Sequence, residues 1–516
     1  MTAARSLAAG TFTDRGPVRL VPDARRVVAQ LFLPGQEGSA PGASRAAGVV
    51  DRCLALDEQQ AGDLLAEIVA SHGTRHRAFR ELLEEHFAAV AHRIEGAAAL
   101  SATRRQLIGA YFTQEYAVEA AALFNPSVVA HPVQDAGPGR LRIVMSARAV
   151  GEGHVSSLVF RTGTLDLGRP GAGPELVMDP VSPYATTGRL RTTLIEGTRL
   201  RHEAGLAGVD VESMEFVLDG LPPHFTTVEL DLALDRLSAQ KLTRIHTQET
   251  AGLLRRLAHA WYGIEFAPAT ELSERTLMPQ IPAESHGVED VRFVRFTEDD
   301  GTSTLLATYT AYDGRNVQVR RLETADFRSF RSSTLTGEAA TNKGMALFPR
   351  RIAGRYLALS RWDRENITVA SSADGHHWPE ATVVQTPTQP WELIQLGNCG
   401  SPIETPAGWL VLTHGVGPMR RYSIGALLLD LDDPTRVIGQ LRRPLHAPAE
   451  DERDGYVPNV VYSCGALLHG QTLLIPYGCS DSRITTTILD LRAVLDLLVP
   501  TVPTTGPPTN PERRHP

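Results

Sequence analysis

The spacing of hydrophobic residues along the chain changes from helical to strand-like near Phe124. One strand-like piece, Arg26 to Phe32, comes first, and from Leu56 apolar residues recur every three or four positions. Asp57 is placed to cap a helix that runs to about Ser71, and another helix is predicted from Ala102 to Ala122. We expect about three helices whose apolar faces pack together. The middle helix carries Phe79, Leu82, Leu83, Phe87, Val90 and Ile94.

After Phe124 the chain consists of short runs of strand-forming residues separated by turns. Five similar runs begin at Leu141, Leu305, Tyr356, Trp409 and Leu473, and the last four begin 51, 53 and 64 residues apart. This spacing is typical of β-propeller blades, so we predict a mainly β, five-bladed propeller. A second strand is predicted after each of the last four starts, at Val317–Leu322, Ile367–Ser371, Ile424–Leu429 and Thr485–Leu489.

The interval between the first two starts is longer than one blade by about 110 residues. It predicts an insertion at about residues 180–280, with one long helix from Val228 to Trp261. From Thr501 the chain is polar and rich in proline, which is typical of disorder. The predicted regions are 1–120, mostly helical; 121–495, the propeller with its insertion; and 496–516, a disordered tail.

Composition narrows the class of protein. The 516 residues are 42% hydrophobic and 21% charged, which indicates a globular chain. A net charge of -8 without a long basic run argues against nucleic acid as a partner. The sequence shows neither a signal peptide nor about 18 uninterrupted apolar residues, so we expect a soluble protein without a membrane partner. Four dispersed cysteines fit no metal site and no disulfide framework, which favours the cytoplasm.

Adjacent acids, Glu289 and Asp290, follow the turn glycine Gly287 and precede a predicted strand. Asp290 at the entry of a strand can face a cavity, although turn acids often bind only their own backbone. Because a propeller gathers its strand ends around one channel, the polar residues at the strand ends are candidate site residues. They are Asn125, Arg148, Asp290, Arg292, Arg315, Asn316, Lys343, Arg361, Asp363, Glu404, His414, Tyr422, Asn459, Tyr477 and Asp481.

Arg315, Lys343 and His414 are the cationic candidates for an anion site. Arginine offers a planar fork of donors and lysine a compact charge, and both suit an oxyanion. Each one alone is more often a surface residue, because lysine and arginine are mostly exposed. Their recurrence at strand ends favours the anion site.

Eight short motifs follow one another along the second half of the chain. They are Gly287–Arg292, Tyr309–Gly314, Asn342–Arg350, Ser401–Thr405, Gly408–Leu410, His414–Val416, Ala426–Pro434 and Pro458–Val461. In this order they resemble glycoside hydrolase family 130, the β-mannoside phosphorylases and β-1,2-mannosidases. The resemblance covers about Phe124 to Asp490 and implies a five-bladed propeller. The helices before Phe124 and the insertion do not belong to the familiar pattern.

By this resemblance Asp290 is the catalytic acid, which protonates the leaving oxygen through a sugar hydroxyl. Val291 stands where the family commonly has proline. The residues implied to hold the mannose ring are Asn125, Arg148 and Asp363, and Arg292 and Glu404 complete the candidate substrate-binding set. The candidate phosphate-binding set is Arg315, Asn316, Lys343 and His414, with Tyr422 and Asp481 added.

The predicted reaction is phosphorolysis. An inverting hydrolase needs a second carboxylate about 6.5 to 9.5 Å from the acid to activate water, whereas a phosphorylase uses phosphate itself. Because the cationic set is present, we expect an inverting phosphorylase that converts a β-D-mannoside and inorganic phosphate to α-D-mannose 1-phosphate. We expect no metal and no organic cofactor.

Two alternatives stay open. A β-mannosidase would use Glu289, Glu365 or Glu404 as the base. A non-catalytic carbohydrate-binding propeller would use its N-terminal helices for interactions. The linkage, the acceptor sugar, the role of the insertion and a homo-oligomeric state are not decided by the sequence.

Overall fold

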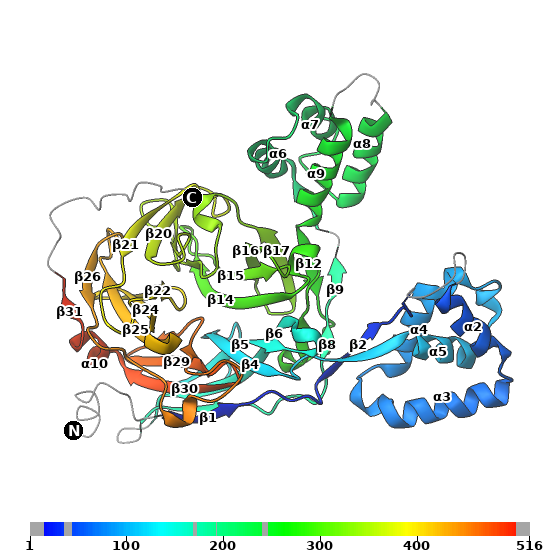
Figure 1. Ribbon diagram of the computed structural model, residues 1–516, viewed down its shortest axis with the longest axis horizontal. Coiled ribbons are helices and arrows are strands. Elements are labelled where there is room, and N and C mark those ends of the chain that lie inside the picture. Colours follow the sequence, from blue (N-terminus) through cyan, green and yellow to red (C-terminus); the bar gives the residue numbers. More distant parts are fainter. Residues whose placement is uncertain (1–14, 36–43, 169–172, 192, 240–245, 502–516) are drawn as a thin grey trace.

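The computed structural model describes residues 15–35, 44–168, 173–191, 193–239 and 246–501. The protein is mainly β, as predicted. In Figure 1 the sheets form one large body, from which two groups of helices project. Within the described ranges, no helix combines the length and the apolar character needed to cross a membrane.

Two antiparallel four-stranded units make up most of the largest sheet. They meet where the first residue of β14 pairs with the first residue of β6, Gly287 with Ser156. The first unit is β4 (Ala122–Ala130), β5 (Arg140–Val150), β6 (Ser156–Asp166) and β7 (Glu175–Met178). The second is β14 (Gly287–Thr297), β15 (Ser303–Tyr312), β16 (Val317–Thr324) and β17 (Ser329–Thr334).

Three further sheets follow in chain order. One is β18 (Ala346–Leu347), β19 (Tyr356–Ser360), β20 (Ile367–Ser372) and β21 (Glu380–Gln385). The next contains β22 (Gln395–Asn398), β23 (Ile403–Thr405), β24 (Gly408–Gly417), β25 (Arg421–Leu429) and β26 (Val437–Gln440). The last contains β27 (Val461–Tyr462), β28 (Leu467–His469), β29 (Thr472–Cys479) and β30 (Arg483–Asp490). All five predicted strand starts and the four predicted second strands lie in these sheets.

Both ends of the described chain add a strand to these sheets. β1 (Arg15–Leu20) pairs with β30, so part of the predicted helical region 1–120 belongs to the last sheet. After α10 (Leu491–Asp496), β31 (Val499–Pro500) pairs with β26. The predicted disordered tail 496–516 is therefore wrong for these residues, and residues 502–516 lie outside the described ones.

The N-terminal helices pack on one another through buried Val50, Phe87 and Ile108. Asp57 caps its helix, as predicted, and the structure adds a capping box with Gln60. The prediction of one helix from Ala102 to Ala122 is wrong, because the chain leaves the helix at Tyr111 and pairs as a strand with residues 27–31. The helices are α2 (Arg45–Ala55), which was not predicted, α3 (Glu58–His72), α4 (Phe79–Val90) and α5 (Ala102–Tyr111); the paired strands are β2 (Val27–Leu31) and β3 (Thr113–Ala117).

The insertion has a hydrophobic core of its own, with Leu200, Val217, Leu234 and Leu254 fully or almost fully buried. The single predicted helix Val228 to Trp261 is wrong: there are two, and residues 240–245 between them lie outside the described part. The helices are α6 (Gly197–Leu206), α7 (Val211–Leu218), α8 (Thr227–Ala239) and α9 (Thr247–His259). Short strands flank them: β8 (Thr186–Thr187), β9 (Arg189–Arg191), β10 (Ile195–Glu196), β11 (His224–Phe225), β12 (Tyr262–Glu265) and β13 (Arg275–Leu277).

Candidate active site

A β-bulge in β14 turns two neighbouring carboxylates toward the same partner. The pairing of β14 with β15 shifts register between Glu289 and Arg292, and Asp290 has a φ of 54°. Neighbouring residues of a regular strand point to opposite faces, whereas a bulge re-aims a side chain. Asp290 therefore lies within β14, not at its entry as predicted.

Arg148, near the end of β5, binds both carboxylates. Its Nη2 lies 2.5 Å from Oε1 of Glu289 and its Nη1 lies 3.5 Å from Oδ1 of Asp290. Its Nε donates to Oγ of Ser156 at 2.8 Å. Asn125 donates from Nδ2 to Oδ1 of Asp290 at 2.6 Å. The predicted residues Asn125, Arg148 and Asp290 are thus in direct contact.

Lys343 reaches Glu289 from the turn before β18. Its Nζ lies 2.6 Å from Oε2 of Glu289 and 5.2 Å from the centre of the Tyr312 ring. Glu289 is therefore shared by two cations, Lys343 and Arg148, and only 3% of it is exposed. A buried carboxylate needs such partners, since burying an unpaired charge is costly.

Arg292 supports the bulge from inside the protein. Its guanidinium donates to the backbone carbonyls of Asp290 at 2.6 Å and Cys399 at 2.9 Å, and to the Tyr462 hydroxyl at 2.8 Å. Because only 2% of Arg292 is exposed, these contacts favour a positioning role over the predicted direct contact with substrate.

Asp290 and Asp481 have carboxyl groups whose pKa values are shifted in opposite directions. Burial raises the pKa of Asp290, but Arg148, Arg292, Lys343 and the hydrogen bond from Asn125 outweigh it and hold the pKa below its usual value. Burial, and after it the charge of Asp290, raises the pKa of Asp481 to about 6. The two carboxyl groups are therefore close enough to interact, which favours a shared site.

A cavity of about 480 Å³ is lined in part by Asn342, the residue before Lys343. Among the described residues that line it, three are arginines, three carry side-chain amides and none is a carboxylate. Such a wall suits an anion, because guanidinium and amide groups donate hydrogen bonds to oxyanions. The lining residues are Arg315, Asn316, Val317, Thr341, Asn342, Arg361, Arg364 and Gln395.

His414, on β24, lies behind this cavity and is almost fully buried. Its Nδ1 faces the carbonyl of Asn398 at 3.2 Å and its Nε2 faces Nη1 of Arg361 at 2.8 Å. Burial, and then the charge of Arg361, holds the pKa of His414 well below its usual value. His414 is therefore neutral, with the proton on Nδ1 and with Nε2 accepting from Arg361. Tyr422 stacks on its ring at 6.0 Å between centroids.

Two predicted residues, Asp363 and Glu404, have local backbone or ion-pair roles. Oδ1 of Asp363 accepts the backbone N–H of Glu365 and Asn366, which closes a turn. Glu404 pairs with Arg350 at 2.7 Å. It lies opposite Trp409, five residues before His414 on β24, so at a rise of about 3.4 Å per residue it is about 17 Å along the strand from the site. The predicted substrate contact of Glu404 does not fit this position.

Sequence reasoning gave no role to Arg361 or Gln395. Arg361 was a candidate only as a strand-end residue, and Gln395 carried no signal because neutral amides are common. The structure brings both to His414, with Nε2 of Gln395 at 3.4 Å from its Nε2. In the described part of the chain, no group of three or more His, Cys, Asp or Glu side chains is arranged to hold a metal ion.

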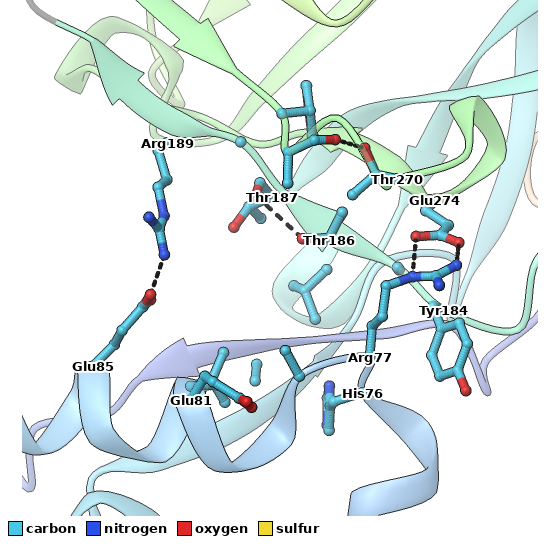
Figure 2. Close-up of a pocket in the computed structure, with 18 of the residues that line it drawn as sticks. His76, Arg77, Glu81, Glu85, Tyr184, Thr186, Thr187, Arg189, Thr270 and Glu274 are labelled. Carbon is cyan, nitrogen blue, oxygen red and sulfur yellow. Dashed lines mark hydrogen bonds and ion pairs between the residues drawn. The ribbon is translucent and has the colours of Figure 1, made fainter.

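A larger cleft of about 740 Å³ lies between α4 and the strands β8, β9 and β12. Figure 2 shows Arg77 directed at Glu274 and Arg189 directed at Glu85, each pair joined across the cleft. The charges that face one another are thus already paired by the protein. We interpret this cleft as the boundary between the N-terminal helices and the main body.

Comparison with known proteins places the chain in a family. Residues 244–499 match a family described as beta-1,4-mannooligosaccharide phosphorylase. A 1,2-beta-oligomannan phosphorylase from Thermoanaerobacter sp. (strain X514) is 32% identical over 238 residues, which are 45% of this chain and 77% of that protein. The chain belongs to glycoside hydrolase family 130, as the sequence motifs indicated.

Other similar proteins carry related names. A beta-1,2-mannobiose phosphorylase from Listeria innocua is 29% identical over 231 residues, 43% of this chain and 63% of that protein. A solved structure of beta-1,2-mannobiose phosphorylase from Listeria innocua with beta-1,2-mannobiose covers 74% of this chain and 92% of its own, at 21% identity and a TM-score of 0.42. The range matched to glycoside hydrolase family 130 contains Asp290, Lys343 and His414, whereas Asn125 and Arg148 precede it.

Proposed function

We propose that this member of glycoside hydrolase family 130 is an inverting phosphorylase. It cleaves a β-D-mannoside with inorganic phosphate and releases α-D-mannose 1-phosphate. The observation that carries the proposal is the cavity walled by three arginines and by Asn342, whose neighbour Lys343 binds Glu289, the residue before the acid Asp290. The similar proteins named as mannoside phosphorylases support the same reaction.

Asp290 acts as the acid and phosphate as the nucleophile. An oxygen of phosphate attacks the anomeric carbon while the bond to the leaving sugar oxygen breaks, and the configuration inverts. The proton of Asp290 reaches the leaving oxygen through a sugar hydroxyl. The cations around Asp290 lower its pKa in the empty site, and bound phosphate adds negative charge that raises this pKa again. Phosphate binding thus prepares the acid for proton transfer.

The sugar is held by the residues around the bulge. Asn125 donates to Asp290 through its amide nitrogen, while its Oδ1 is buried and has no protein partner among the described residues. A sugar hydroxyl would satisfy this oxygen, since buried polar atoms are rarely left unpaired. We assign Asn125 and Arg148 to the mannose ring and Arg361, Lys343, Arg315 and Asn316 to phosphate. Asp481 and Tyr422 complete the proposed site.

The contacts of the candidate bases disfavour hydrolysis. Glu289 is bound by Arg148 and Lys343 through both of its oxygens. Glu404 is bound by Arg350 at the far end of β24. Glu365 is exposed and is not among the described residues that line the anion cavity. A water-activating carboxylate opposite Asp290 is required for an inverting hydrolase, and these three positions do not supply it.

We further infer that the sheets are the blades of a five-bladed propeller. Five buried hydrophobic clusters join one sheet to the next, including the last to the first. In the closing cluster Ile143 of β5 packs with Leu474 of β29. Such an arrangement supports a closed ring of five units, whose strand ends surround the site. A cytoplasmic location and a homo-oligomeric state stay predictions.

Incubation with a panel of β-mannosides, with and without inorganic phosphate, tests the reaction. We expect sugar phosphate to form only when phosphate is present, with β-1,2- and β-1,4-mannobiose as the first substrates to test. Turnover in phosphate-free buffer that phosphate does not accelerate would establish a mannosidase instead. Sugar binding without product under both conditions would establish a carbohydrate-binding protein.

A further inference from the structure

Glu289 has a position that neither acid nor base catalysis explains. Both of its oxygens are bound by cations, at 2.5 Å to Arg148 and 2.6 Å to Lys343, and it is buried. The bulge at Asp290 brings this carboxylate to the same side of β14 as the catalytic acid. Its negative charge therefore acts on the cations that surround the reaction.

The two cations differ in their freedom to move. Arg148 is held at three points, by Glu289, Asp290 and Ser156. Lys343 has Glu289 as its one ion-pair partner among the described residues, and 35% of its side chain is exposed. A lysine carries its charge on a flexible four-carbon chain. Lys343 can thus exchange partners, whereas Arg148 is fixed.

The anion cavity begins beside Lys343. Its neighbour Asn342 lines the cavity and donates through Nδ2 to the backbone carbonyl of Arg361 at 3.0 Å. Lys343 directly follows this wall residue and carries its charge on a flexible chain, so phosphate in the cavity is a second candidate partner for the ammonium group that binds Glu289. An ammonium that binds one of them more tightly is less available to the other.

We propose that Glu289 competes with phosphate for Lys343 and thereby sets the affinity of the enzyme for phosphate. This inference rests on the proposed phosphorolysis. In the empty site the ion pair holds Lys343 in place and neutralises the buried charge of Glu289. When phosphate enters, Lys343 moves to it and Glu289 keeps Arg148. Glu289 is a positioning residue, and its presence keeps phosphate affinity lower than the cations alone would give.

The test is the phosphate affinity of Glu289→Gln, measured by calorimetry with inorganic phosphate alone and as KM for phosphate in turnover. Because the amide cannot neutralise Lys343, we expect the dissociation constant for phosphate to fall about fivefold or more, the size of a coupling between charged neighbours. KM for the mannoside should not fall, because Arg148, which we assign to the mannose ring, loses one of its three contacts. If Glu289 only supported the structure, its replacement would weaken the binding of phosphate and of the mannoside together.

Lys343→Gln, alone and combined with Glu289→Gln, tests whether the change in phosphate affinity acts through Lys343. Lys343→Gln should weaken phosphate binding, and Glu289→Gln added to it should no longer tighten binding. Glu119→Gln is the matched control, since Glu119 is a buried carboxylate that binds two arginines, Arg26 and Arg161, in another cluster. We expect its phosphate affinity to equal that of the wild type.

Weaker or unchanged phosphate binding by Glu289→Gln, or tightening that persists without Lys343, would overturn the proposal. Should Glu289→Gln fail to fold, Glu289→Asp serves in its place, because the shorter carboxylate cannot contact both cations and should also tighten phosphate. Wild-type protein that binds phosphate but makes no sugar phosphate would refute the proposed function, while the calorimetry would still decide the role of Glu289.

Discussion

At the scale of single residues, the site depends on two carboxyl groups in one electrostatic environment. Cations hold the pKa of Asp290 below its usual value, whereas burial and the charge of Asp290 raise the pKa of Asp481 to about 6. The sequence marked Asp290 through a family motif and Asp481 as a polar residue at a strand end. It could not show their opposite pKa shifts, because these depend on burial and on charges such as those of Arg148 and Lys343, which are distant in the sequence.

The raised pKa of Asp481 predicts a dependence of stability on pH. The folded pKa of about 6 lies above the ordinary value of 3.8, so the stabilising effect is complete below pH 4 and is lost as pH rises through 6. The loss amounts to at most about 3 kcal/mol, at 1.36 kcal/mol per pKa unit. Asp481→Asn should remove this slope and be more stable than the wild type at pH 7. Urea unfolding of both proteins at pH 4, 5, 6 and 7 measures how the free energy of unfolding changes with pH. Equal slopes for the two proteins would contradict the raised pKa of Asp481.

At the scale of elements, the bulge of β14 connects the fold to the chemistry. The sequence predicted a strand directly after Asp290, and its apolar residues Val291, Phe293 and Phe296 are buried. It did not predict the bulge, because the positive φ of Asp290 is imposed by the neighbouring strands and leaves no signal in a non-glycine residue. The helix α5 was likewise predicted too long. The residues after Tyr111 form β3, which pairs with β2, and do not continue the helix.

Gly287→Ala tests the start of β14. The glycine has a φ of 152°, and an added Cβ would lie 2.7 Å from Cβ of Ser156, the residue that accepts from Arg148. Overpacking of this kind costs about 1–3 kcal/mol, and we expect a lower melting temperature together with lower activity. The control is Gly301→Ala, with a φ of 84° and nothing within 4 Å of the new Cβ. Equal effects of both changes would show that the contact with Ser156 is unimportant.

At the scale of the whole molecule, the repeat along the sequence predicted the sheets but not how the ends of the chain join them. β1 pairs with β30, and the Thr485 hydroxyl donates to the carbonyl of Val18 across 467 residues. No local pattern predicts so distant a partner. The spacing of the strands revealed the insertion. It did not separate the four helices that the structure describes there, which share one buried core.

The N-terminal helices are attached across the cleft of Figure 2 by Arg77 and its buried partner Glu274. Glu274 also accepts from Ser182 at 3.0 Å. Arg77→Met leaves this carboxylate without its cation, which costs about 1–3 kcal/mol. We expect faster hydrogen exchange in α4 with phosphorolysis unchanged, measured by mass spectrometry and a product assay. The control is Arg80→Met, whose exposed side chain binds only Gln106 among the described residues. An unchanged exchange rate in α4 would show that the pair does not attach the helices.

The anomeric configuration of the product, followed by NMR, tests the account most directly. Wild-type protein, given β-1,2-mannobiose and inorganic phosphate, should form α-D-mannose 1-phosphate, and Asp290→Asn should form almost none while keeping the wild-type fold by circular dichroism. Mannose without a sugar phosphate, a β-configured product, or full activity of Asp290→Asn would contradict it.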